Sequence, residues 1–186
     1  ACMQVFGGHG FIKEWGMEQF VRDNRINMIY EGTNTIQSLD LLGRKVLGNN
    51  GATLQKFGKL VGKLVAEEGV NEKMAEFINP IAYLGDQMTK FTTEIGFKGY
   101  QNPDEIGAAA VDYLRVAGHL VFGYFWARMA QTALREIAAG NTDPFYVAKL
   151  QTARFYFAKL FPETATLMRT ARAGSKVLID TDAALA

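Results

Sequence analysis

A helix that is apolar on every side of its middle is the feature that most constrains how this chain can fold. The Asn-Pro-Asp-Glu motif at residues 102–105 is a helix-start signature: a capping residue, proline at the first helical position, then acids in the first turn. Gly140 marks the expected end. Only 12 residues separate Arg115 from Arg128, short of the roughly 20 that span a bilayer. The sequence therefore predicts a buried central helix and no membrane span here.

Apolar residues recur at helical spacing on both sides of this helix. One stripe lies in residues 54–65. A second lies in residues 74–95 and passes Pro80, where we expect a kink or a restart because proline lacks an N–H donor. The Thr-Asp-Pro motif at residues 142–144 starts another helix, which breaks at Pro162. Because no strand-like alternation is present, we predict an all-α chain whose second part is an antiparallel bundle of about four to five helices.

A four-residue helix breaker, Gly-Asn-Asn-Gly at residues 48–51, marks the expected main domain boundary. We expect residues 1–48 to belong to one helical domain and residues 52–174 to form the bundle, whose last short helix ends near Gly174. The small and acidic residues of 175–186 are expected to form a loosely held tail.

Three glycines in the central helix, Gly107, Gly118 and Gly123, each lower its helix propensity by roughly 1 kcal/mol relative to alanine. We therefore expect them to permit close helix crossings. His119, in the same stretch, is interpreted as a core histidine with hydrogen-bond partners rather than as a ligand.

Phenylalanine is abundant, with 13 residues in 186, and many of them lie in the two helices after Asn102. A small bundle has limited interior for so many rings, so some should lie at an interface. The composition thus predicts self-association, with a twofold-related dimer favoured.

Charge and cysteine usage exclude several other classes. A net charge of +1 argues against a nucleic-acid-binding protein, which normally carries a clustered basic surface. The single cysteine, Cys2, excludes an internal disulfide and fits a reducing compartment, so we expect a cytoplasmic protein. Its separation from the two histidines leaves no zinc-like cluster.

One carboxylate stands out near the start of the chain. Glu31 lies between Tyr30 and Gly32, just before an amphipathic stretch that Thr33 can cap. A loop at a helix start can aim a carboxylate into a cleft, and an adjacent aromatic such as Tyr30 can shield it from water. Those conditions favour a general base with a raised pKa. The alternative is that Glu31 only stabilises the helix N-terminus.

Two motifs identify a resemblance. The segment MIYEGTNTIQ at residues 28–37 resembles the catalytic-base signature of the acyl-CoA dehydrogenases, I-Y-E-G-T-x-x-I-Q, and matches every fixed position. Upstream, QVFGGHGF at residues 4–11 resembles the Q-x-x-G-G-x-G-F element of that family, and Arg22-Asp23 fits its R-D pair. Residues 112–115 and the aromatic run after them resemble the extra carboxy-terminal helical domain of a long branch, the branch that includes methylmercaptopropionyl-CoA dehydrogenase.

The resemblance implies a chemistry and a set of roles. Glu31 is the base that removes the proton alpha to the thioester carbonyl of an acyl-CoA, while a hydride leaves the beta carbon for the flavin of FAD. The Gly32 backbone lies against the thioester end of the substrate. The residues implied to contact FAD are Thr33 and Thr35 near its diphosphate and, toward the adenosine of a neighbouring subunit's FAD, Gln4, Gly7 and Gly8. At Thr35 several relatives carry glutamine.

The resemblance also implies partners. We expect the carboxy-terminal part of a longer homo-oligomeric enzyme that passes electrons to electron-transfer flavoprotein, with FAD held by the full-length parent and not by this fragment. Two alternatives remain open. The glycines near residues 7–10 can form a simple chain reversal that needs positive φ. The bundle can also be an assembly or partner-binding module from a non-catalytic relative.

Arg44 is expected to face solvent, and His9 to fill a variable position of the motif.

Overall fold

The computed structural model describes residues 2–179, and its regular elements in that range are all helical, which confirms the predicted all-α fold. The chain divides after Ser38 into two compact units. This division lies ten residues before the predicted breaker at residues 48–51. The reason is that Leu42 and Val46, which precede the breaker, are buried in the core of the second unit. The breaker ends a helix, but the contacts of the bundle begin before it.

The first unit consists of short helices. Their bounds are α1 Cys2–Val5, η1 Gly7–Phe11, η2 Lys13–Trp15, α2 Met17–Arg25, η3 Ile26–Met28 and α3 Thr33–Leu39, whose last residue belongs to the second unit. An ion pair of 2.6 Å between Arg22 and Glu18 lies along α2. The ring of Trp15 packs against Phe6 and His9, with centroids 6.0 and 5.5 Å apart. His9 is therefore a packing residue of this unit.

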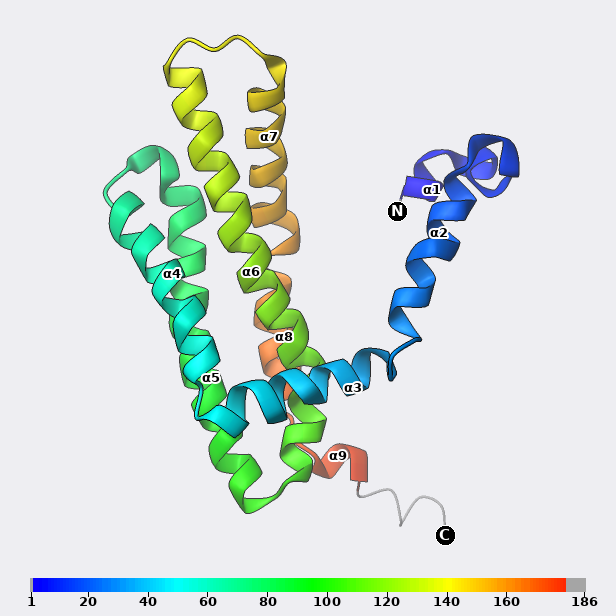
Figure 1. Cartoon of the computed structure of the whole chain (residues 1–186), viewed down its shortest axis with the longest axis vertical. Helices are drawn as coiled ribbons and strands as arrows, with labels where there is room; N and C mark the ends of the chain where they lie inside the picture. Colours follow the sequence, from blue (N-terminus) through cyan, green and yellow to red (C-terminus); the bar gives the residue numbers. More distant parts are fainter. Residues whose placement is uncertain (1, 180–186) are drawn as a thin grey trace. The chain divides into compact units, whose positions relative to one another are not determined.

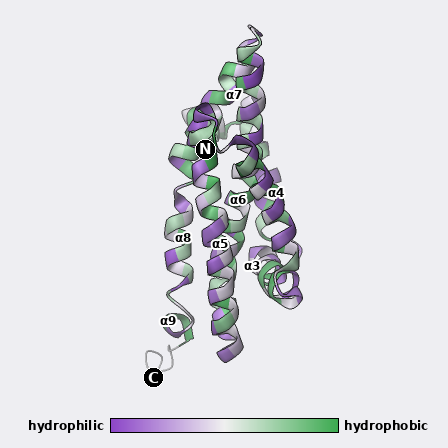
Figure 2. Ribbon diagram, turned by 90° about the vertical axis from the view of Figure 1, so that its left-hand side faces the viewer, coloured by the Kyte–Doolittle hydropathy of each residue, from purple (hydrophilic) through white to green (hydrophobic). Residues whose placement is uncertain are grey.

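The second unit is a bundle of longer helices (Figure 1). Their bounds are η4 Asp40–Val46, η5 Leu47–Asn49, α4 Ala52–Glu68, η6 Glu72–Met74, α5 Ala75–Gln101, α6 Asp104–Ala138, α7 Pro144–Phe155, η7 Tyr156–Leu160, α8 Glu163–Ala171 and α9 Lys176–Ile179. In Figure 2 the ribbons of α4, α5 and α8 alternate between hydrophobic and hydrophilic residues, as expected for helices that bury one face.

The central helix has the bounds and the position that the sequence predicts. α6 contacts α5, α7 and α8 and lies between them in Figure 1. Its start is capped by Asn102, whose Oδ1 accepts a hydrogen bond of 3.1 Å from the Asp104 N–H. None of the helices within residues 2–179 has both the length and the apolar character needed to cross a membrane.

The core between α5 and α6 is built from aromatic rings. Phe91 stacks on Tyr113 with centroids 5.7 Å apart, and both side chains are fully buried. The Thr92 hydroxyl shares a 2.7 Å hydrogen bond with the Tyr113 hydroxyl, which satisfies this buried polar group. Burial raises the pKa of Tyr113 to about 12, so the phenol stays neutral.

Pro80 does not restart its helix. α5 runs as one element from Ala75 to Gln101 with Pro80 inside it, so the expected restart is wrong. Proline removes a single N–H donor, and the buried side chains of Phe77, Ile78 and Ile81 on either side hold this turn in place.

The glycine prediction holds at one position of three. A Cβ on Gly123 would lie 2.7 Å from a ring carbon of Phe161 and 3.6 Å from Ile81, so α6 is crossed closely there. The prediction is wrong for Gly107 and Gly118, where a Cβ would meet no described atom within 4 Å. Sequence spacing shows that a glycine lies in a helix but not which face a neighbour covers.

The start of the expected loose tail is held in place. Ser175 is buried, and Glu105 Oε1 accepts hydrogen bonds from its backbone N–H at 2.9 Å and from its hydroxyl at 2.6 Å. The hydrogen bond from the Ser175 hydroxyl, followed by the one from its backbone N–H, holds the pKa of the Glu105 carboxyl below its usual value of 4.5. Residues 175–179 therefore contain an anchor and the short helix α9, and residues 180–186 lie outside the described residues.

We expect Ser175→Ala to lower the melting temperature more near neutral pH than in acid. Because the pKa of Glu105 is lower in the folded than in the unfolded chain, its bonds to Ser175 stabilise the fold above about pH 4.5. That contribution is lost as the pH falls through the lowered value. Thermal unfolding of both chains from pH 7 to pH 3 measures the difference. A difference in melting temperature between wild type and Ser175→Ala that stays constant with pH would contradict this assignment. So would a Glu105→Gln variant whose melting temperature equals that of the wild type at pH 7.

Candidate functional site

The turn that enters α3 has an unusual backbone. Glu31, Gly32 and Thr33 have positive φ angles of 54°, 86° and 67°. Glycine adopts this region freely, but glutamate does so rarely and β-branched threonine more rarely still. Each such non-glycine residue costs of order 1–3 kcal/mol and persists only where its surroundings fix it. The sequence motif thus coincides with a strained turn.

Four hydrogen bonds hold this turn. The Thr33 N–H donates to the Tyr30 carbonyl at 3.1 Å, and the Ile36 N–H donates to the Gly32 carbonyl at 3.3 Å. The Gln37 side chain donates to the Glu31 carbonyl at 3.0 Å. The Thr35 N–H donates to the Thr33 hydroxyl oxygen at 3.3 Å, so Thr33 caps the helix as predicted. The side chains of Thr33 and Gln37, both fixed positions of the motif, therefore support the backbone that presents Glu31.

Gly32 has a steric reason to be glycine besides its φ angle. A Cβ at this position would lie 2.8 Å from the Cβ of Ile36 and 2.9 Å from both of its γ carbons. Those atoms belong to the rigid branch of a helical side chain, which cannot rotate away without leaving its rotamer. No other residue type fits this turn without moving α3.

We expect Gly32→Ala to loosen the start of α3, because the φ strain and the clash with Ile36 add roughly 1–3 kcal/mol to the folded turn. Backbone amides of residues 34–38 should exchange about tenfold faster with solvent, as measured by hydrogen–deuterium exchange. Gly8→Ala is the matched control, since a Cβ there meets no described atom within 4 Å. Equal protection in Gly32→Ala and wild type would show that the turn is not strained.

The Glu31 carboxylate is open to solvent and has no hydrogen-bond or ion-pair partner within residues 2–179. The expected shielding by Tyr30 is absent: its side chain is 49% exposed, and its hydroxyl donates to Asn27 Oδ1 at 3.2 Å. The hydroxyl finds its partner one helical turn back rather than beside the carboxylate. The first unit therefore fixes the backbone at Glu31, but it leaves the Glu31 carboxylate exposed to solvent.

The glycines of the motif at residues 4–11 do not all have the same structural reason to be glycine. Gly7 has a φ of 58°, which fits the simple chain-reversal interpretation, and a Cβ on Gly10 would lie 2.2 Å from the Met3 carbonyl oxygen. Neither reason applies to Gly8, which has open space and no positive φ. Gln4 lies exposed on α1. Within residues 2–179 no hydrogen bond or ion pair joins this motif to the Glu31 turn.

The remaining candidates have structural roles. The side chain of Arg44 is 80% exposed and pairs with Asp40, as expected for a solvent-facing residue. His119 is satisfied at both ring nitrogens, by the Tyr156 hydroxyl at 3.0 Å and by Glu163 Oε2 at 3.2 Å. Across residues 2–179, no group of three or more His, Cys, Asp or Glu side chains could hold a metal ion.

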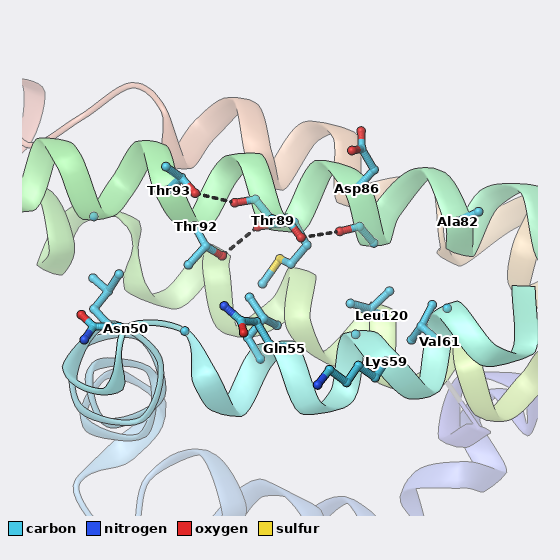
Figure 3. A pocket seen from close by; sticks show the side chains of 18 of the residues that line it. Asn50, Gln55, Lys59, Val61, Ala82, Asp86, Thr89, Thr92, Thr93 and Leu120 are labelled. Carbon is cyan, nitrogen blue, oxygen red and sulfur yellow. Dashed lines mark hydrogen bonds between the residues drawn. The ribbon is translucent and has the colours of Figure 1, made fainter.

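Sequence reasoning did not identify a groove of about 1,010 Å³ in the second unit. α4 forms one wall and α5 the other, with Leu120 of α6 at the base (Figure 3). A signal was present in the sequence, because Gly58 and Gly62 are four residues apart and so lie on one face of α4. Their meaning depends on whether α5 closes against that face, which periodicity does not indicate.

Comparisons with known proteins match both parts of the chain. Residues 1–47 match the family described as "Acyl-CoA dehydrogenase, C-terminal domain", and residues 53–182 match "Acetyl-CoA dehydrogenase C-terminal like". The two matches leave residues 48–52, which include the predicted breaker, between them.

Curated relatives match most of this chain but only part of their own length. The chain is 36% identical over 165 residues to 3-methylmercaptopropionyl-CoA dehydrogenase of Ruegeria pomeroyi, covering 87% of this chain and 28% of that protein. It is 25% identical to a broad-specificity linear acyl-CoA dehydrogenase of Mycobacterium tuberculosis, covering 86% and 28%. It is 26% identical to a butyryl-CoA dehydrogenase of Syntrophomonas wolfei, covering 96% and 30%.

Proposed function

Because this chain belongs to the acyl-CoA dehydrogenase family, we propose that it is the carboxy-terminal part of an FAD-dependent enzyme that oxidises an acyl-CoA thioester between its alpha and beta carbons. Glu31 is the base that takes the alpha proton. The observation that carries the proposal is the turn at residues 31–33, which holds an unpartnered carboxylate on a strained backbone. The chain spans under a third of the relatives that it matches, so this activity belongs to the whole protein.

The chemistry explains why position matters for this base. A proton alpha to a thioester is too weakly acidic for a carboxylate in water, so the site must polarise the thioester carbonyl and exclude water. Glu31 takes the proton onto a carboxylate oxygen, and the thioester end of the substrate lies against the Gly32 backbone. The Gln37 and Thr33 hydrogen bonds hold the backbone of the turn from which the Glu31 side chain extends toward the alpha carbon.

The residues implied for FAD fit a polar cofactor. FAD, when bound by the whole protein, would accept the hydride that leaves the beta carbon. The Thr33 hydroxyl oxygen accepts from the Thr35 N–H, which leaves its own proton free to donate to a diphosphate oxygen. Thr35, Gln4 and Gly7 are exposed, and Gly8 has space that nothing in this unit fills. These residues could accept the cofactor without rearranging the turn.

The proposal extends to the partners of the whole protein. Its substrate is an acyl-CoA, its electron acceptor is electron-transfer flavoprotein, and it assembles as a homo-oligomer. In the oligomer, Gln4, Gly7 and Gly8 would reach the adenosine of a neighbouring subunit's FAD. Exposed phenylalanines on the bundle support self-association, because an isolated surface rarely leaves so many rings in water. In the two helices after Asn102 they are Phe122, Phe125, Phe145 and Phe155, each at least 55% exposed.

The experiment that tests the proposed function is the replacement of Glu31 by glutamine in the whole protein, with flavin reduction by an acyl-CoA as the readout. A variant that binds substrate but does not reduce the flavin supports Glu31 as the base.

A further inference from the structure

The groove between α4 and α5 is long and mostly apolar. Its base includes three buried side chains, those of Val61, Met88 and Leu120. On α4 the lining residues run from Leu54 to Val65, a length of about 16 Å along the helix axis. This shape suits an extended hydrocarbon chain better than a compact ring system.

Two glycines keep the groove open. A Cβ on Gly58 or Gly62 would meet no described atom within 4 Å. Each glycine costs roughly 1 kcal/mol of helix propensity relative to alanine, and no close helix crossing at these positions compensates for it. α4 and α5 approach each other at a different glycine, Gly85 of α5. A Cβ on Gly85 would lie 3.8 Å from Cγ1 of Val61 on α4. The space beside Gly58 and Gly62 is therefore left for a molecule outside the described bundle.

The polar groups of the groove give it one unpaired positive charge. Lys59 and Gln55 lie on the α4 side, and within residues 2–179 neither side chain has a hydrogen-bond or ion-pair partner (Figure 3). Asp86, on α5, is paired with Lys90 at 2.7 Å and points away from α4. The wall thus offers an ammonium and an amide, with no free carboxylate facing them.

The threonines on α5 add no competing donor. The Thr89 hydroxyl donates to the Gly85 carbonyl and the Thr93 hydroxyl to the Thr89 carbonyl, both at 3.1 Å. Thr92 is bonded to the Met88 carbonyl and to Tyr113. Because these hydroxyl protons are used within the bundle, an anionic group in the groove would find its neutral donors on Gln55, Asn50 and Tyr100 and its one unpaired ammonium on Lys59.

We propose that this groove binds a fatty acid of medium to long chain, with its carboxylate at Lys59 and Gln55 and its hydrocarbon chain along the apolar base. The single unpaired ammonium matches a ligand with one negative charge. A CoA thioester, with several phosphate charges, would lack cations here. This site is separate from Glu31, so its failure and the failure of the proposed dehydrogenase activity are distinguishable.

The test is isothermal titration calorimetry of the chain with laurate below its micelle concentration. We expect saturable one-to-one binding. Lys59→Gln should weaken it roughly fivefold to tenfold, and Gly62→Leu, which places a side chain in the groove, should abolish it. Lys56→Gln removes the same charge from the same helix outside the groove and should leave laurate binding unchanged. Dodecanol should bind more weakly than laurate and be indifferent to Lys59→Gln.

Several outcomes would overturn the proposal. They are non-saturable binding of laurate, equal affinity for dodecanol, tighter binding of lauroyl-CoA than of laurate, or unchanged binding in Gly62→Leu. Circular dichroism confirms that each variant is folded, and Gly58→Leu replaces Gly62→Leu if the latter is not. Dissociation of a dimer by these leucine variants, seen by sedimentation velocity, would show that a second copy occupies the groove instead.

Discussion

Glutamine in place of Glu31 should slow reduction of the flavin in the whole protein by at least about 10²–10⁴-fold, the usual effect of losing a general base. The amide keeps the size and shape of the side chain but cannot accept the alpha proton. The positive φ of residue 31 is no more strained for glutamine than for glutamate, so the turn and acyl-CoA binding should survive. Stopped-flow loss of flavin absorbance after mixing with acyl-CoA measures the rate, and a titration measures binding.

Glu14→Gln is the matched control, because Glu14 is another exposed glutamate of the first unit and lies outside both motifs. Its flavin should be reduced at nearly the wild-type rate. A wild-type rate in Glu31→Gln would show that Glu31 is not the base. It would favour the alternative in which the chain is a helical assembly module from a non-catalytic relative.

Phe91→Ala should produce a large loss of stability, about 3–5 kcal/mol. The ring is fully buried, stacks on Tyr113 and lies 5.0 Å beneath the Arg172 guanidinium, so its removal opens a cavity where α5, α6 and the end of α8 meet. Urea unfolding followed by circular dichroism measures the change, and the melting temperature should fall by roughly 10 °C.

Phe97→Ala makes the same chemical change on the same helix, but the ring of Phe97 is 66% exposed. It should alter the free energy of unfolding by less than about 0.5 kcal/mol. Similar losses in the two variants would mean that the α5–α6 core is not packed as described.

Local signals in the sequence located the ends of the long helices. The side chains of Asn102 and Asp143 accept the hydrogen bonds that start α6 and α7, and α6 ends at Ala138, two residues before the αL residue Gly140. Caps and αL glycines act within a few residues, so they can be recognised without a fold. The strained turn at Glu31 is different, because neither glutamate nor threonine favours positive φ. Its residues were identified by resemblance, whereas their backbone angles come from the structure.

Pairing between helices could not be derived in the same way. Gly107, Gly118 and Gly123 have the same type of signal in sequence, yet a neighbouring side chain approaches closely at Gly123 alone among them. The groove beside Gly58 and Gly62 and the anchoring of Ser175 by Glu105 join segments far apart in the chain. By itself the sequence determined the all-α class, the buried central helix and the motif that carries Glu31. The tertiary structure decided which helix faces close and which stay open, because that depends on how distant side chains fill the space between helices.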